Sequence, residues 1–170
     1  MGRKRRSERG GGTRATVALD RAGVGFELHA YDLGHAAPEG SVGQAVAAHL
    51  GLPAEVVFKT LLAEVDGRPV CAVVPTAGSL SLKALAAAAG GKRARMMDPG
   101  DAERISGYVT GGISPFGQLK ELPTFLDDSA ADLPTMLVSA GQRGLQLELS
   151  PAALPAILGA TYVHGLGVGR

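Results

Sequence analysis

The chain alternates short apolar segments with glycine- and proline-rich turns, and the period of the apolar residues predicts both strands and helices. We expect helices over residues 15–22, 44–50, 82–89, 98–104 and 151–158, and strands over residues 26–31, 57–62, 69–74, 94–97, 124–127, 135–139, 145–149 and 161–164. Helices interrupt the strands irregularly. The order therefore favours an α+β (mixed α/β) fold, a single domain with a mixed, barrel-like β-sheet surrounded by helices.

The strand predicted over residues 57–62 is the most informative segment, because one lysine interrupts a run that is apolar on both faces. Lys59 shares its face with Val57 and Leu61. The pair Asp66-Gly67 predicts a hairpin turn to an equally apolar strand, so both strands are expected in the middle of a sheet. A lysine at such a position has to be paired, shifted in pKa or directed into a cleft.

A second notable segment is the loop GGISPFG over residues 111–117. Its glycines permit backbone conformations closed to other residues and let a ligand approach the main chain. Successive peptide N–H groups could hold an anion or a developing oxyanion, or the segment could be an ordinary surface turn. It matches neither a Walker phosphate loop nor a dinucleotide-binding fingerprint.

Length, charge and cysteine content narrow the class of protein. With 170 residues, a net charge of +1 and the single cysteine Cys71, the chain is expected to form one domain without disulfides. We see no apolar signal segment and no membrane span, so we expect a cytoplasmic location. Four arginines and a lysine within residues 3–9 precede three glycines. They predict a flexible basic N-terminal arm over residues 1–12, either a solvated tail or an RNA-contacting arm.

Other candidate groups offer less chemistry. The histidines at positions 29, 35, 49 and 164 show no zinc spacing, so we expect no metal and no cofactor. Cys71 is expected in the core, without a neighbour that would activate its thiol. Asp127 and Asp128 would point to opposite faces of a strand, although one of them could face Lys59. A structural ion pair of Lys59 with Asp98, Asp101 or Asp127 stays an alternative.

Four segments then line up in order: residues 58–61 (FKTL), 97–104 (MDPGDAER), 107–117 (GYVTGGISPFG) and 139–145 (SAGQRGL). Together they resemble the YbaK/EbsC family of bacterial aminoacyl-tRNA deacylases, from about Phe26 to the C-terminus. The resemblance places an editing domain over residues 13–170. It implies a trans-editing hydrolase, free of cofactor and metal, that removes cysteine mischarged on tRNA(Pro) and works with or near prolyl-tRNA synthetase.

The resemblance also implies which residues form the site. Lys59 corresponds to the essential polar group of the family. The positions implied to line the substrate pocket are Tyr31, Thr60, Gly111, Gly112, Ser114, Ser139 and Gln146. Family members often carry an aspartate where this chain has Gln146, which can form hydrogen bonds but cannot act as a base.

The implied reaction needs no protein nucleophile, because a cysteinyl ester carries its own thiol and can cyclise to a thiolactone. Lys59 would then orient the ribose or the ester, and N–H groups of the glycine loop would stabilise the carbonyl oxygen. Two alternatives stay open. The chain could remove alanine or another small residue with water as the nucleophile, or it could be a non-catalytic module that binds the tRNA acceptor end or a synthetase.

Overall fold

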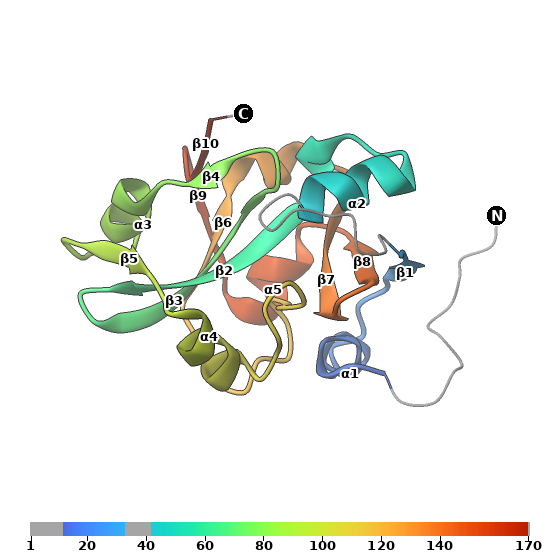
Figure 1. Ribbon diagram of the computed structural model, residues 1–170, viewed down its shortest axis with the longest axis horizontal. Coiled ribbons are helices and arrows are strands. Elements are labelled where there is room, and N and C mark those ends of the chain that lie inside the picture. Colours follow the sequence, from blue (N-terminus) through green and yellow to red (C-terminus); the bar gives the residue numbers. More distant parts are fainter. Residues whose placement is uncertain (1–11, 33–41, 170) are drawn as a thin grey trace.

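The computed structural model in Figure 1 describes residues 12–32 and 42–169, and its elements follow the predicted order. The helices are α1 (Arg14–Arg21), α2 (Val42–Leu50), α3 (Leu82–Ala88), α4 (Pro99–Ser106) and α5 (Ala153–Leu158), with the 3-10 helices η1 (Ala54–Val56) and η2 (Asp128–Asp132). The predicted arm up to residue 11 and the site of His35 lie outside the described residues.

All eight predicted strands are present, most of them within two residues of the predicted bounds. In the described part of the chain, the strands are β1 (Glu27–Ala30), β2 (Phe58–Val65), β3 (Arg68–Pro75), β4 (Ser79–Leu80), β5 (Ala94–Met96), β6 (Thr124–Asp127), β7 (Met136–Gln142), β8 (Leu145–Leu149), β9 (Thr161–Val163) and β10 (Gly167–Val168). The short strands β4 and β10 were not predicted. They pair only with each other, and two-residue strands carry no periodic signal in the sequence.

A five-stranded mixed sheet with the order β5-β2-β3-β6-β9 forms one half of the molecule. Strand β2 is antiparallel to β3 and β5, whereas β6 runs parallel to β3 and β9. The predicted hairpin turn is confirmed, since Asp66 and Gly67 both have positive φ angles of 49° and 80°. Both strands of that hairpin lie inside the sheet, as predicted.

The second sheet is antiparallel, with the order β1-β8-β7, and it meets the first sheet along one edge. A single parallel bridge between Val57 and Leu137 joins the start of β2 to β7. The described strands form separate sheets and do not close into a barrel. The mixed sheet with helices around it confirms the predicted α+β class, in a more open form than a barrel.

The main core lies between the two sheets. Phe58 and Leu62 of β2 pack there with Val138 of β7 and Leu147 of β8, and helix α1 adds Leu19. The other face of the five-stranded sheet is partly covered by α3, whose Leu85 packs on residues that include Ala63 and Val65 of β2. Alternate residues of β2 thus enter two different cores, as strand geometry requires. Within the described residues, no helix combines the length and the hydrophobicity that crossing a bilayer demands.

Candidate active site

Lys59 lies near the start of β2, on the face that also carries Leu61, Ala63 and Val65. Its side chain is half-buried, and burial lowers the pKa of its ammonium group from the ordinary lysine value. In the described part of the chain, Lys59 has no carboxylate among its hydrogen-bond or ion-pair partners. Of the three possibilities for a lysine in this strand, pairing with a described carboxylate is therefore ruled out, and burial favours a lowered pKa.

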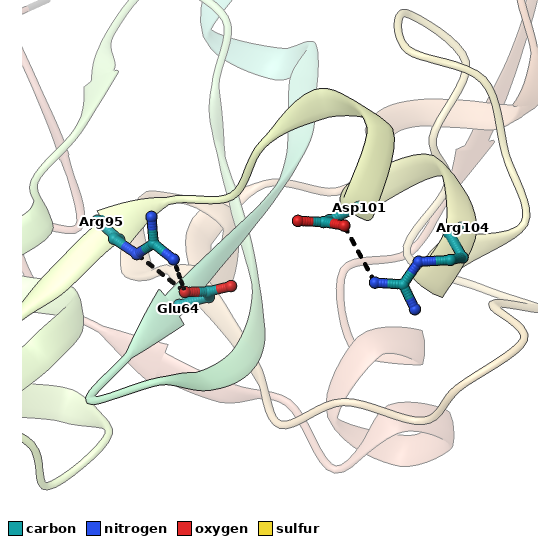
Figure 2. A network of polar contacts seen from close by, with 4 residues as sticks. All are labelled: Glu64, Arg95, Asp101 and Arg104. Carbon is teal, nitrogen blue, oxygen red and sulfur yellow. Dashed lines mark hydrogen bonds and ion pairs between the residues drawn. The ribbon is translucent and has the colours of Figure 1, made fainter.

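The carboxylates considered as partners of Lys59 have other roles. Asp98 caps α4 by accepting a hydrogen bond from the Gly100 N–H group at 3.0 Å. Asp101 forms an ion pair with Arg104 on the surface of α4 (Figure 2). Asp127 is fully buried and accepts a 2.7 Å hydrogen bond from the N–H group of Gly167, which ties β6 to β10. These bonds define local structure rather than the surroundings of Lys59.

Strand register places Ser139 and Gln146 on the same face as Lys59, the face turned away from the main core. Val57 and Leu137 form the parallel bridge between β2 and β7, so Lys59 and Ser139 are each two residues further along their strands. Ser139 is in turn directly opposite Gln146 of β8. Because side chains two residues apart share a face, these three predicted site residues lie in one row across the junction of the sheets.

Gln146 is the most unusual polar group of this row. Only 6% of the residue is exposed, and its buried side-chain carbonyl oxygen Oε1 has no hydrogen-bond partner among residues 12–32 and 42–169. A buried acceptor of this kind costs about 1 to 3 kcal/mol unless a donor reaches it. Ser139 is less buried, and its Oγ accepts the N–H group of Gly141 at 3.2 Å. Oε1 of Gln146 can therefore accept a hydrogen bond, provided that the donor displaces the atoms that bury it.

Tyr31 and Thr60 occupy different surroundings. Tyr31 follows β1, and its N–H group donates a 2.9 Å hydrogen bond to the carbonyl oxygen of Gly144, which places it at the β7–β8 turn. Thr60 is 9% exposed and lies on the opposite face of β2 from Lys59, toward the main core. Its Oγ1 is buried and has no hydrogen-bond partner among the residues that the structure describes. The side chain of Thr60 is thus not brought to the row of Lys59, Ser139 and Gln146.

The glycine loop docks on the turn between β7 and β8. A Cβ atom on Gly112 would lie 2.9 Å from the backbone nitrogen of Arg143 and 3.0 Å from backbone carbons of Gln142, so only glycine fits there. Gly111 has a φ of +87°, a conformation that glycine adopts readily. Arg143 Nε donates a 2.8 Å hydrogen bond to the carbonyl oxygen of Thr110. These contacts bring the loop to the end of the strand that carries Ser139.

Inside the loop, several polar groups are already used. Ser114 is completely buried, and its Oγ accepts the N–H group of Phe116 at 3.3 Å. The Gly112 N–H group donates to the carbonyl oxygen of Val109 at 2.9 Å. Ser114 thus supports the loop from within, and its place in the pocket stays a prediction.

Tyr108 is a structural residue of this loop to which sequence reasoning gave no role. Its hydroxyl group donates a 2.6 Å hydrogen bond to the carbonyl oxygen of Phe116, and burial raises the pKa of the phenol to about 12. The guanidinium of Arg14 lies 5.4 Å from the centroid of the Tyr108 ring. The residue stood in a recognised motif, but nothing in the sequence indicated that its hydroxyl group closes the loop.

The remaining candidates are a thiol and one acidic cluster. Cys71 is fully buried, which confirms its predicted place in the core, and this burial raises the pKa of its thiol to about 12. That the thiol is unreactive stays a prediction. Glu27, His29 and Glu148 have potential metal-ligand atoms within 4.8 Å of one another. His29 Nε2 lies 2.8 Å from Glu148 Oε1, so a histidine–carboxylate hydrogen bond accounts for this cluster. The predicted absence of a metal stays a prediction.

Comparisons with known proteins indicate the family of this chain. Residues 37–157 match the model of the aminoacyl-tRNA editing domain family. The chain is 39% identical over 122 residues to EbsC of Enterococcus faecalis, named as a candidate Cys-tRNA(Pro)/Cys-tRNA(Cys) deacylase, and the match covers 71% of this chain and 74% of EbsC. YwhH of Bacillus subtilis is 33% identical over 64 residues, which cover 38% of this chain and 41% of YwhH.

A solved structure supports the fold. A protein described as a candidate trans-editing enzyme for prolyl-tRNA synthetase superposes with a TM-score of 0.75 at 21% identity, over 92% of this chain and 96% of that protein. At this identity the likeness concerns the fold alone, and it extends over nearly all of both chains. The family match and the EbsC match carry the assignment of function class. The chain therefore belongs to the aminoacyl-tRNA editing domain family and is an aminoacyl-tRNA deacylase, as its resemblance to the YbaK/EbsC family implied.

Proposed function

We propose that this protein deacylates Cys-tRNA(Pro), and that Lys59 is its central catalytic group. The observation that carries the proposal is a half-buried lysine with no carboxylate partner in the described residues, on the same face as the unpartnered Oε1 of Gln146. A cation and a buried acceptor in one row suit a ligand that carries both negative charge and hydrogen-bond donors, as an aminoacylated adenosine does. The similarity to EbsC supports cysteine as the amino acid.

The proposed reaction uses the thiol of the substrate. The cysteinyl sulfur attacks its own ester carbonyl carbon, the bond from that carbon to the ribose oxygen breaks, and the ribose oxygen takes up the proton released by the thiol. The products are tRNA with a free terminal hydroxyl group and a cysteine thiolactone, which water opens to cysteine. This route requires no nucleophile from the protein. The only cysteine of the chain, Cys71, is fully buried and thus unsuited to that role.

The protein contributes position and charge in this mechanism. The ammonium group of Lys59 would hydrogen-bond the ribose or the ester and stabilise negative charge on the departing oxygen. Gln146 would accept a hydrogen bond from the α-ammonium group of the substrate through Oε1, because an amide oxygen accepts but cannot remove a proton. The glycine loop would approach the ester from the end of β7, where Gly112 is in close contact with the backbone.

Partners and location follow from the proposed reaction. The substrate is a mischarged tRNA that is held by its acceptor end, and prolyl-tRNA synthetase, which produces such errors, is the proposed protein partner. Since charged tRNA is used in the cytoplasm, the protein is proposed to act there. Tyr31 and Thr60 stay candidate substrate contacts, the first at the β7–β8 turn and the second through the backbone of β2, next to Lys59.

The decisive experiment follows the decay of cysteinyl-, seryl- and alanyl-tRNA(Pro) with catalytic amounts of the protein. Seryl-tRNA replaces the thiol with a hydroxyl group, and alanyl-tRNA offers no internal nucleophile. Lys59→Ala is the test variant. Lys120→Ala is the matched control, because Lys120 is an exposed lysine that belongs to neither the row nor the loop. Circular dichroism and thermal unfolding verify that both variants fold.

We expect rapid loss of the cysteinyl ester alone, at least 100-fold slower with Lys59→Ala, which corresponds to about 2.7 kcal/mol in the activation free energy. The Lys120→Ala variant should retain the wild-type rate. Equal hydrolysis of alanyl- and cysteinyl-tRNA would contradict thiol assistance and indicate attack by water. Full activity of a folded Lys59→Ala variant would contradict the catalytic role of Lys59, and protection of all three esters would indicate a binding module.

A further inference from the structure

A groove of about 440 Å³ lies between α3 and the segment that leads into β5, well separated from Lys59 along the sheet. Its lining includes Lys83, Ala86 and Ala87 of α3 together with Gly91, Lys92 and Arg93. None of the residues that line the groove is acidic. Neither the resemblance nor the proposed reaction assigns a role to this part of the surface.

The sequence explains why the surface is hollow at this place. The side of α3 that faces the groove carries small alanine side chains, and the chain returns close to the hairpin turn of β2 and β3. A Cβ atom on Gly91 would lie 2.4 Å from Val65 Cγ1, so glycine allows this close passage. The carboxylate of Asp66 then accepts the N–H groups of Lys92 and Arg93, both at 3.0 Å. The basic segment is therefore fixed at its backbone, and its side chains are left on the surface.

The groove concentrates positive charge. Lys83, Lys92 and Arg93 are all exposed, and none of them forms an ion pair with another described residue. Asp66 is near Arg93, and the two backbone N–H groups that it accepts hold its pKa below the ordinary range, so its carboxylate is charged and offsets part of the positive charge beside the groove. Three solvent-exposed cations around a hollow without acidic residues form a binding surface for a chain of phosphates.

Arg95 of β5 provides an internal contrast two residues beyond Arg93. It is directly opposite Glu64 of β2, and its guanidinium group lies 2.6 Å from Glu64 Oε2 (Figure 2). Residues 64 and 95 lie on the face of the sheet away from α3, because Ala63 and Val65 point toward α3. Arg95 is thus paired with a carboxylate at the surface, and it does not line the groove.

The groove and Lys59 share one face of the five-stranded sheet, at opposite ends of β2. Ala94 beside the groove pairs with Val65, six residues along β2 from Lys59. At about 3.3 Å per residue this separation is roughly 20 Å. Successive phosphates of one strand in an A-form RNA duplex are about 3 Å apart along the axis, so the separation corresponds to roughly six to seven nucleotides. A strand whose last nucleotide lies at Lys59 can therefore place its stem at the groove.

We propose that the groove between α3 and β5 binds the sugar–phosphate backbone of the tRNA acceptor stem through Lys83, Lys92 and Arg93. This inference rests on the proposed function, since it assumes that the acceptor end lies at Lys59. It adds a second contact that recognises RNA by charge and shape, whereas the row of Lys59, Ser139 and Gln146 recognises the aminoacyl ester. The stem contact contributes to affinity and is independent of the amino acid.

The test uses the full chain and a variant in which Lys83, Lys92 and Arg93 are all replaced by alanine. Arg95→Ala is the matched control, because it removes a cation that is close in sequence to Lys92 and Arg93 but does not line the groove. Binding of uncharged tRNA(Pro) is measured by fluorescence anisotropy between 50 and 200 mM salt, a range over which phosphate contacts weaken measurably. Deacylation is measured on full-length Cys-tRNA(Pro) and on a cysteinylated CCA trinucleotide that lacks the stem.

We expect the triple variant to bind tRNA at least 10-fold more weakly, with a salt slope reduced by about 2 to 3 for three lost phosphate contacts. The triple variant should deacylate the trinucleotide at the wild-type rate. Arg95→Ala should change neither the tRNA affinity nor its salt slope. Unchanged tRNA affinity and slope in the triple variant would overturn the inference, as would an equal loss with Arg95→Ala. Because binding is measured without turnover, a failure of the proposed reaction would leave this result interpretable.

Discussion

Replacing Gly112 with alanine tests the close contact between the glycine loop and the β7–β8 turn. The added methyl group would lie 2.9 Å from the nitrogen of Arg143 and 3.0 Å from two backbone carbons of Gln142. Backbone atoms cannot rotate away as a side chain can, so the turn or the loop has to shift. Gly112 is not among the glycines with a positive φ, so the effect is steric rather than conformational.

Overpacking of this kind costs about 1 to 3 kcal/mol. For a chain of this size, 1 kcal/mol corresponds to about 2 to 4 °C, so we expect the melting temperature to fall by about 2 to 12 °C. If the loop also lines the ester pocket, the shift should slow the deacylation of Cys-tRNA(Pro) at a temperature at which the variant is fully folded. Thermal unfolding followed by circular dichroism and single-turnover deacylation measure the two effects separately.

Gly100→Ala is the control for the glycine-to-alanine change itself. A Cβ atom on Gly100 meets only Asp98 Oδ1, at an ordinary 3.5 Å, and the residue lies in the first turn of α4, where alanine costs nothing or stabilises. We expect an unchanged or higher melting temperature. A Gly112→Ala protein with the same melting temperature as the wild type would refute the close contact. A lower melting temperature with an unchanged deacylation rate would refute the role of the loop in the pocket.

Two further predictions concern titratable groups. Burial lowers the pKa of Lys59 in the folded state below the ordinary value of about 10.4. At a pH between these two pKa values, the unfolded chain binds more protons than the folded chain. The free energy of unfolding of the wild type therefore rises with pH across this interval. Lys59→Met should lack this rise, which urea unfolding at pH 8 and pH 10 measures; an identical pH dependence in the variant would count against the shift. Cys71, with a pKa raised to about 12 by burial, should resist iodoacetamide in the native protein and react in urea. Labelling of the native protein at the unfolded rate would show that the thiol is accessible.

Local rules in the sequence were enough to locate most of the elements. The pair Asp66-Gly67 specifies a tight hairpin because both residues tolerate positive φ, and the structure has this turn. Ser81 and Asp98 cap α3 and α4 by accepting N–H groups of the first turn, as their positions before helical segments predict. Such signals involve residues close in sequence, so a single sequence contains them completely.

Pairing between distant segments could not be predicted in the same way. The sequence made Lys59 conspicuous, but its neighbours Ser139 and Gln146 are fixed by the bridge between Val57 and Leu137, which joins residues 80 positions apart. The role of Asp127 was likewise open, and the structure assigns it to the N–H group of Gly167. Which of several carboxylates meets a given donor depends on how the sheets meet, and no local pattern encodes this.

The sequence by itself determined the class of fold, the buried lysine strand and the glycine loop, because periodicity, turn chemistry and motif order are properties of short segments. The tertiary structure alone decided that Gln146 is a buried acceptor without a partner and that the side chain of Thr60 points into the core. It also assembled the basic groove from α3 and the start of β5. Burial and charge clustering arise only when elements distant in sequence pack together, so they are properties of the folded chain.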